Sequence, residues 1–213
     1  MKKTVVELIG SAGVGKTFIG EQLRRSLCVD TFRAELCLAD VAWSFLSWVK
    51  ILSVLPTLER DRYKIARMML RKTMSWRAAS RINQGTFLFD EGPWHFLAGS
   101  IAPRLKKEES FVFHTWSHYM ELPDLVVHLT ADCDLLRHRR VQRNRVNEKT
   151  IDIDKVTEAH LRFDQAVDCL RVRFPHVDVL QIKIDNSTRP EDVVETICAH
   201  LDAYAETNKD TLL

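Results

Sequence analysis

The chain has 213 residues, 46% of them hydrophobic, and a formal net charge of +2. These values fit one α/β domain with an ordinary core, and the charge is too small to indicate nucleic-acid binding by itself. The five cysteines are scattered, odd in number and without a C-x-x-C pair, which predicts neither a zinc site nor a disulfide framework and suits the reducing cytoplasm.

A phosphate-binding loop near the start of the chain is the most informative stretch. A strand-like run at 4–9 leads into it, and the helical pattern that follows has Phe18, Ile19, Leu23 and Leu27 as apolar positions. In such a loop the glycines turn backbone N–H groups toward phosphate oxygens, the lysine reaches the β- and γ-phosphates, and the hydroxyl ligates Mg²⁺. The sequence therefore predicts a site for ATP and Mg²⁺, with Thr17 on the metal, made by Gly10, Ser11, Ala12, Gly13, Val14, Gly15, Lys16 and Thr17.

Three segments lie between this loop and the next clear strand. Residues 31–38 have the weak periodicity of a short second strand, and residues 40–55 predict a largely buried helix. Asp40 and Lys50 argue against a membrane span there, although 38–55 keeps a membrane-surface or partner-binding face as its alternative. Residues 57–82 predict a very basic helix, which is either a solvated face or a positive wall beside an anionic substrate.

A short apolar strand at 86–89 ends in Asp90-Glu91-Gly92-Pro93. A triphosphate site needs a carboxylate near Mg²⁺, and Asp90 is placed to hold a metal-bound water or to accept the proton of the attacking hydroxyl. Glu91 could do the second task, and a divalent cation would relieve the repulsion between the two carboxylates. The alternative is that these residues form only a polar turn.

The rest of the chain alternates strands and helices. Strands are expected at 125–129 and 177–184, and helices at 94–105, 108–120, 132–145, 153–174 and 191–205. This alternation predicts a parallel sheet with helices on both faces. Ligands of such sheets bind beyond the carboxyl ends of the strands. The segments at those ends, which should therefore converge on one rim, are the phosphate loop, 90–91, 130–131 and 185–186.

An arginine-rich helix follows the strand at 125–129. Arg139 and Arg143 lie four residues apart and share a helix face, as do Arg137 and Arg140 at three. Guanidinium groups bind the charge that spreads over a moving phosphoryl group, and a hinged segment that carries them also keeps water out. We expect Arg139 and Arg143 to act in catalysis and Arg140 in nucleotide binding, with a solvated basic helix as the alternative.

The order of the motifs along the chain resembles that of the nucleoside and nucleotide kinases among P-loop proteins. These motifs are the phosphate loop, the Asp-Glu strand end, the P-D-L-V-V-H-L strand with its arginine-rich helix, and the I-D-N-S-x-x-P loop. Thymidylate kinases and deoxynucleoside kinases are the most similar. The resemblance implies a single α/β domain over residues 1–213, with three layers and a five-stranded parallel sheet in the order 2-3-1-4-5. It also implies a helical acceptor-side insertion at 40–84, between strands 2 and 3. Mg-ATP would be the donor, with a lid at about 137–149 and the 185–189 loop, including Asp185 and Ser187, beside the adenine.

The acceptor side departs from these families. The acid–arginine pair that usually follows the third strand is Asp90-Glu91 here, and Asp40-Val41-Ala42-Trp43 only faintly echoes the E-P-V-x-x-W of deoxynucleoside kinases. The acceptor can therefore be a nucleoside, a nucleotide or another small molecule, in a pocket made by 40–84 with Trp94 and His95. Each tryptophan, Trp43 or Trp94, would stack on a ring or else lie in the core, and His95 would bind the acceptor or be structural.

Other uses of a phosphate loop fit less well. A GTPase would need N-K-x-D and D-x-x-G motifs, which do not occur with the right spacing. A P-loop ATPase that acts on nucleic acid, or is regulated by a protein or membrane partner, is the main alternative, since an Asp-Glu pair can serve an ATPase. The sequence carries no strong nucleic-acid signal and leaves open whether the chain forms a homodimer.

Overall fold

The computed structural model describes residues 3–27, 85–90, 92–101, 122–142 and 153–210, with single residues at 42, 45, 46, 49, 67, 70 and 74. The expected alternation of strands and helices is confirmed over these ranges. In chain order the elements are β1 (Thr4–Gly10), α1 (Lys16–Ser26), β2 (Thr86–Asp90), α4 (Pro93–Phe96), the π-helical turn η1 (Leu97–Ile101), β3 (Leu125–Ala131), α6 (Cys133–Gln142), α7 (Ile153–Arg173), β4 (Asp178–Ile184) and α8 (Pro190–Asp210).

The described strands form one parallel sheet in the order β2-β1-β3-β4. These are four strands and not the five expected in the order 2-3-1-4-5, because the expected second strand at 31–38 lies outside the described residues. β1 is central: Leu8 is paired with Asp90 of β2, and Gly10 with Leu129 of β3. The carboxyl ends of the strands therefore meet at one edge, as the rim of the sequence prediction requires.

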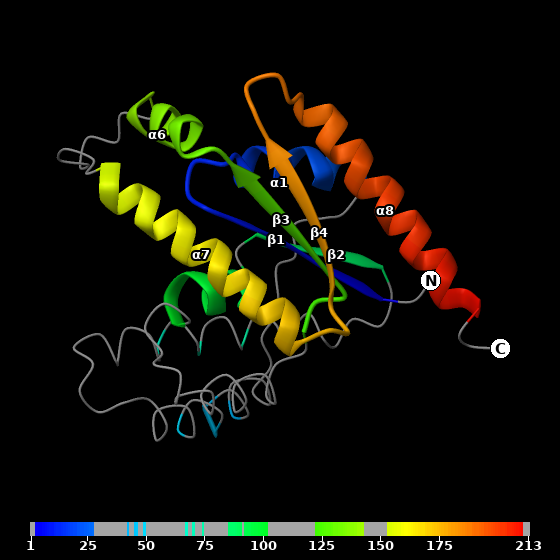
Figure 1. The fold of residues 1–213 in the computed structure, drawn as a ribbon. Coiled ribbons are helices and arrows are strands. Elements are labelled where there is room, and N and C mark those ends of the chain that lie inside the picture. Colours follow the sequence, from blue (N-terminus) through cyan, green and yellow to red (C-terminus); the bar gives the residue numbers. More distant parts are fainter. Residues whose placement is uncertain are drawn as a thin grey trace.

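Helices cover both faces of this sheet, which gives three layers (Figure 1). α1 and α8 lie on one face, and α7 with the α4–η1 segment lies on the other. Because successive side chains of a strand point to opposite faces, β1 serves both cores. Val5 and Ile9 join the cluster of α7, whereas Val6 and Leu8 join the cluster of α1 and α8.

Three apolar side chains of the 38–55 segment are only half-buried. Phe45, Leu46 and Val49 are each helical and are 53%, 60% and 47% exposed. The expectation of a largely buried helix is therefore wrong at these three positions. Among the helices that the structure describes, none has the length and hydropathy to cross a membrane.

Candidate functional site

The phosphate loop connects the end of β1 to the start of α1 and begins at Gly10. This residue has φ 149°, and a Cβ on it would lie 2.4 Å from the carbonyl oxygen of Leu129 on the neighbouring strand. The loop therefore leaves the sheet so close to β3 that only glycine fits at its first position. The loop ends at Gly15, which precedes the first turn of α1 and so aims the amino end of that helix into the site.

Gly10→Ala should weaken the binding of Mg-ATP at least about tenfold, because the added methyl group must displace either the loop or β3. Gly85→Ala is a matched control: Gly85 also has positive φ, at 103°, but a Cβ there would meet nothing within 4 Å. Its cost should be limited to about 1–2 kcal/mol of backbone strain, without loss of affinity. Titration calorimetry and thermal melts measure both quantities. Equal affinities for the two variants would contradict the crowding at Gly10.

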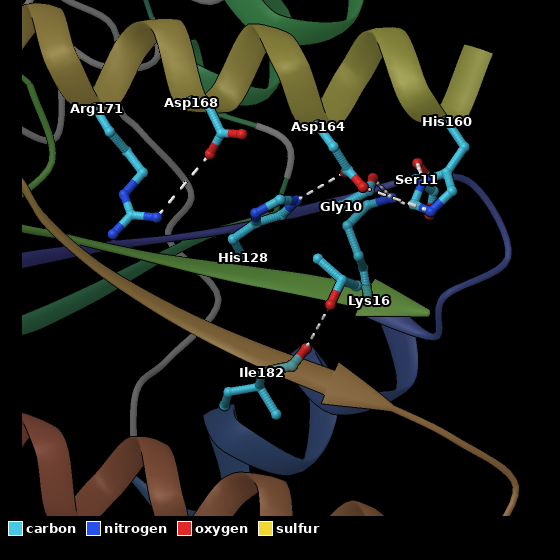
Figure 2. Close-up of polar contacts among 10 residues, drawn as sticks. Gly10, Ser11, Lys16, His128, His160, Asp164, Asp168, Arg171 and Ile182 are labelled. Carbon is cyan, nitrogen blue, oxygen red and sulfur yellow. Dashed lines mark hydrogen bonds and ion pairs between the residues drawn. The ribbon is translucent and has the colours of Figure 1, made fainter. Parts of the chain in front are cut away.

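Lys16 lies over the loop rather than in solvent. It is 8% exposed, and its Nζ donates to the carbonyl oxygen of Gly10 at 2.8 Å and to that of Ser11 at 3.4 Å (Figure 2). The ammonium group is thus held at the mouth of the loop, where N–H groups and the helix dipole already favour negative charge. Thr17 follows it, exposed in the first turn of α1.

Two adjacent arginines of α6 contact the loop from above. Arg139 donates from Nη1 to the carbonyl oxygen of Val14, and Arg140 donates from Nε to that of Ala12, both at 3.1 Å. The structure therefore brings Arg139 and Arg140 to the phosphate loop across more than 120 residues of sequence. Arg143 lies outside the described residues, as does the rest of the expected lid beyond residue 142.

A cavity of about 340 Å³ lies between the loop, α6 and the start of α8. Its volume is in the range of small-ligand sites. Phe18, 54% exposed, lines it, whereas Ile19 and Leu23 are buried. Of the apolar positions of the helical pattern, Phe18 therefore lies off the buried face of α1, because residues one apart on a helix point in different directions. The other lining residues include Gly13, Gly15, Arg139, Ile184 and Thr188.

The loop after β4 reaches this cavity through Thr188. The Asp185 carboxylate accepts hydrogen bonds from the backbone N–H groups and the hydroxyls of Ser187 and Thr188, at 2.7–2.8 Å. These bonds, that from the Thr188 hydroxyl foremost, lower the pKa of Asp185 to about 2. Asp185 and Ser187 thus shape the loop, and Thr188 is the residue of the three that faces the cavity.

A second cavity, of about 180 Å³, lies on the opposite side of the phosphate loop. The loop contributes Gly10, Ser11 and Ala12 to it, and α6 contributes Arg140. His95 and His160 lie in the same lining, so the structure places His95 beside the end of the loop. Trp94 is fully buried in the core, 6.2 Å from the Phe174 ring between centroids, which rules out the ring-stacking role and confirms the core alternative.

The sequence prediction assigns the metal site to Thr17 and Asp90. Among the described residues no three His, Cys, Asp or Glu side chains lie together as a metal cluster. Mg²⁺ at a triphosphate needs few protein ligands, because phosphate oxygens and waters fill most of its shell. A threonine hydroxyl and a strand-end carboxylate are hard oxygen donors that fit this need. The backbone of Asp90 lies at the rim beside Leu8, and Glu91 lies outside the described residues.

Glu7, in the middle of β1, is a residue near this site that the sequence interpretation missed. It is fully buried, and its two carboxylate oxygens accept the N–H groups of Trp94 and His95 at 3.0 and 2.7 Å. A carboxylate at the amino end of α4 is favoured both by these bonds and by the helix dipole. Gly92 makes the approach possible, since a Cβ there would lie 2.6 Å from the Glu7 carboxyl carbon. An acidic residue inside an otherwise apolar strand was the available signal.

Glu7→Ala should lower the free energy of unfolding by about 2–5 kcal/mol, because it removes the acceptor of one buried and one part-buried N–H group. Glu7→Gln keeps one carbonyl oxygen and should lose roughly half as much. Urea denaturation of the two variants gives the comparison. A loss below 1 kcal/mol for Glu7→Ala would mean that α4 does not depend on this cap.

Comparison with known proteins identifies the fold. No protein-family model and no curated protein sequence matches this chain. Among solved structures, a deoxyadenosine kinase from M. mycoides with the products dCMP and dCDP bound has a TM-score of 0.59 at 13% identity, covering 94% of this chain and 100% of its own. A thymidylate kinase from Ehrlichia chaffeensis has a TM-score of 0.57 at 12% identity, covering 95% and 99%. The expected resemblance to nucleoside and nucleotide kinases is thereby confirmed for the fold.

Proposed function

We propose that this protein is a small-molecule kinase that uses ATP and Mg²⁺ to phosphorylate a nucleoside, a nucleotide or another small acceptor. One observation carries the proposal: the phosphate loop has a cavity on each side. Gly13, Gly15 and Arg139 face the first, and Ser11 and Arg140 face the second. Phosphoryl transfer needs a donor and an acceptor on opposite sides of the phosphate, and such positioning supplies much of the catalysis.

The first cavity suits the base and sugar of the donor. Phe18 offers an exposed aromatic face, which can stack on a purine. Thr188 supplies a polar edge, so the 185–189 loop keeps its proposed place beside the adenine, with Asp185 and Ser187 shaping it. In this proposal the triphosphate follows the loop from Gly15 back toward Gly10.

The reacting end of the triphosphate then lies between the two cavities. Lys16 binds the β- and γ-phosphates, and Arg139 and Arg143 neutralise the charge of the moving phosphoryl group. Mg²⁺, when bound by Thr17 and Asp90, would neutralise the phosphates and orient them. Asp90 or Glu91 accepts the proton of the acceptor hydroxyl.

The second cavity holds the reactive end of the acceptor. At about 180 Å³ it takes a sugar or phosphate group rather than a whole nucleotide, and the remainder of the acceptor pocket is assigned to residues 40–84. The named activities of the two structural neighbours make nucleosides and nucleotides the first acceptors to test. We retain the second strand at 31–38, at the outer edge of the sheet beside β2, and we place the activity in the cytoplasm.

ADP formation in the presence of Mg²⁺ tests this function directly. The purified chain should turn over slowly alone and faster with one class in a panel of nucleosides, nucleoside monophosphates and other small alcohols. Stimulation by DNA or RNA, with no response to any small molecule, would instead favour the ATPase. Omitting Mg²⁺ should return every rate to background.

A further inference from the structure

A chain of polar contacts links the core of the sheet to the phosphate loop. His128 of β3 is 3% exposed, and its Nε2 lies 3.2 Å from Oδ1 of Asp164 on α7. The other oxygen of Asp164 lies 3.5 Å from Nε2 of His160, which is 8% exposed. The Nδ1 of His160 in turn lies 2.7 Å from Oγ of Ser11 (Figure 2). The Asp164 carboxylate thus contacts the imidazoles of both His128 and His160, and the His160 imidazole contacts the phosphate loop.

These contacts bear on which nitrogen of His160 donates and which accepts. The carboxylate can only accept, so a proton on His160 Nε2 faces the Asp164 oxygen that lies 3.5 Å away. In the neutral tautomer with the proton on Nε2, Nδ1 accepts and the Ser11 hydroxyl donates to it across 2.7 Å. Because His160 and Asp164 lie four residues apart on α7, they share a face of that helix and hold this geometry together.

Ser11 also contributes to the internal hydrogen bonds of the phosphate loop. Its carbonyl oxygen accepts from the backbone N–H of Val14 at 3.3 Å and from Nζ of Lys16 at 3.4 Å. Holding the Ser11 side chain in place therefore also fixes the Ser11 carbonyl oxygen, which closes the turn of the loop and accepts a hydrogen bond from Lys16. The sequence gives no hint of this contact, since Ser11 and His160 are 149 residues apart.

We propose that His160 is a positioning residue for the phosphate loop, holding Ser11 through its Nδ1 while Asp164, itself bonded to His128, contacts the other side of the His160 ring. The inference rests on the proposed function in that ATP is the ligand of the loop. His160 acts through Ser11, and this contact makes α7 a partner in nucleotide binding.

Two substitutions at one position separate this role from simple burial. Asparagine places an amide oxygen near the position of Nδ1, so His160→Asn keeps an acceptor for Ser11. Glutamine reaches the position of Nε2, so His160→Gln keeps a donor for Asp164 and loses Ser11. By titration calorimetry with Mg-ATP, His160→Gln and Ser11→Ala should each weaken affinity about five- to tenfold, and His160→Asn less than about threefold.

The double variant Ser11→Ala/His160→Gln should bind no more weakly than either single variant, because both remove the same bond. His200→Gln is the matched control: it alters another His–Asp pair, 2.6 Å from Asp178, on the α8 side of the sheet, and should leave affinity unchanged. Equal losses for His160→Asn and His160→Gln, or additive losses in the double variant, would overturn the inference. A wild-type chain that binds no Mg-ATP would overturn the proposed function, and this inference with it.

Discussion

Lys16→Met should lower kcat/KM for phosphate transfer by about a hundred- to a thousandfold, the usual cost of removing one charged donor from a developing oxyanion. Methionine keeps most of the volume of this buried side chain, which is 8% exposed, and removes only the ammonium group. The loss should therefore appear as lost catalysis and weaker ATP binding, with the melting temperature nearly unchanged. Initial rates with the preferred acceptor, together with calorimetry, give the three values.

Lys183→Met is the matched control for this loss. Lys183 lies on β4 and pairs with Asp132 at 3.0 Å, but its side chain is 66% exposed. A surface ion pair of this kind contributes little, so the control should remain within about twofold of wild type in kcat/KM. A Lys16→Met variant that retained more than a tenth of wild-type activity would mean that the loop does not hold the transferred phosphate.

Asp90→Asn should lower kcat by about a hundredfold while changing the affinity for ATP less than about threefold. The substitution keeps size and hydrogen-bonding capacity but removes the charge that would face Mg²⁺. The Mg²⁺ concentration needed for half-maximal rate should rise as well. Steady-state kinetics at varied Mg²⁺, with calorimetry of ATP binding, distinguish these effects.

Asp124→Asn is the matched control, at the amino edge of the sheet. Its Oδ2 accepts the backbone N–H of Val5 at 2.7 Å, and asparagine still offers an oxygen there, so kcat should stay within about twofold of wild type. If Asp90→Asn lowered kcat and ATP affinity by the same small factor, Asp90 would belong to a polar turn and not to the metal site.

The sequence predicts the phosphate loop and the succession of elements because both are written in local patterns. A run of β-prone residues, fixed glycine spacing and helical periodicity involve residues close together in the chain. The positions of Arg139 and Arg140 over the loop could also be anticipated, since parallel strands bring their carboxyl ends to one rim. The carbonyl that each guanidinium contacts follows only from the fold.

The features that the sequence did not predict depend on distant partners. Glu7 accepts hydrogen bonds from Trp94 and His95, which are 87 and 88 positions further along the chain. Nothing in the local sequence marks an acidic residue of a strand as a helix cap. His160 is one of several polar residues on α7 until the fold brings Ser11 to it. Phe18 and Ile19 are both apolar neighbours on α1, but their side chains point in different directions. Which of the two is buried is set by the way α1 lies on the sheet.

The fate of the γ-phosphate tests the central claim most directly. The wild-type chain is incubated with Mg²⁺ and ATP labelled at the γ position, with and without a mixture of nucleosides and nucleoside monophosphates, and the products are separated. The account predicts that label moves to a phosphorylated small molecule with the wild-type chain and not with Lys16→Met. Label found only in inorganic phosphate, at a rate that no small acceptor changes, would contradict it.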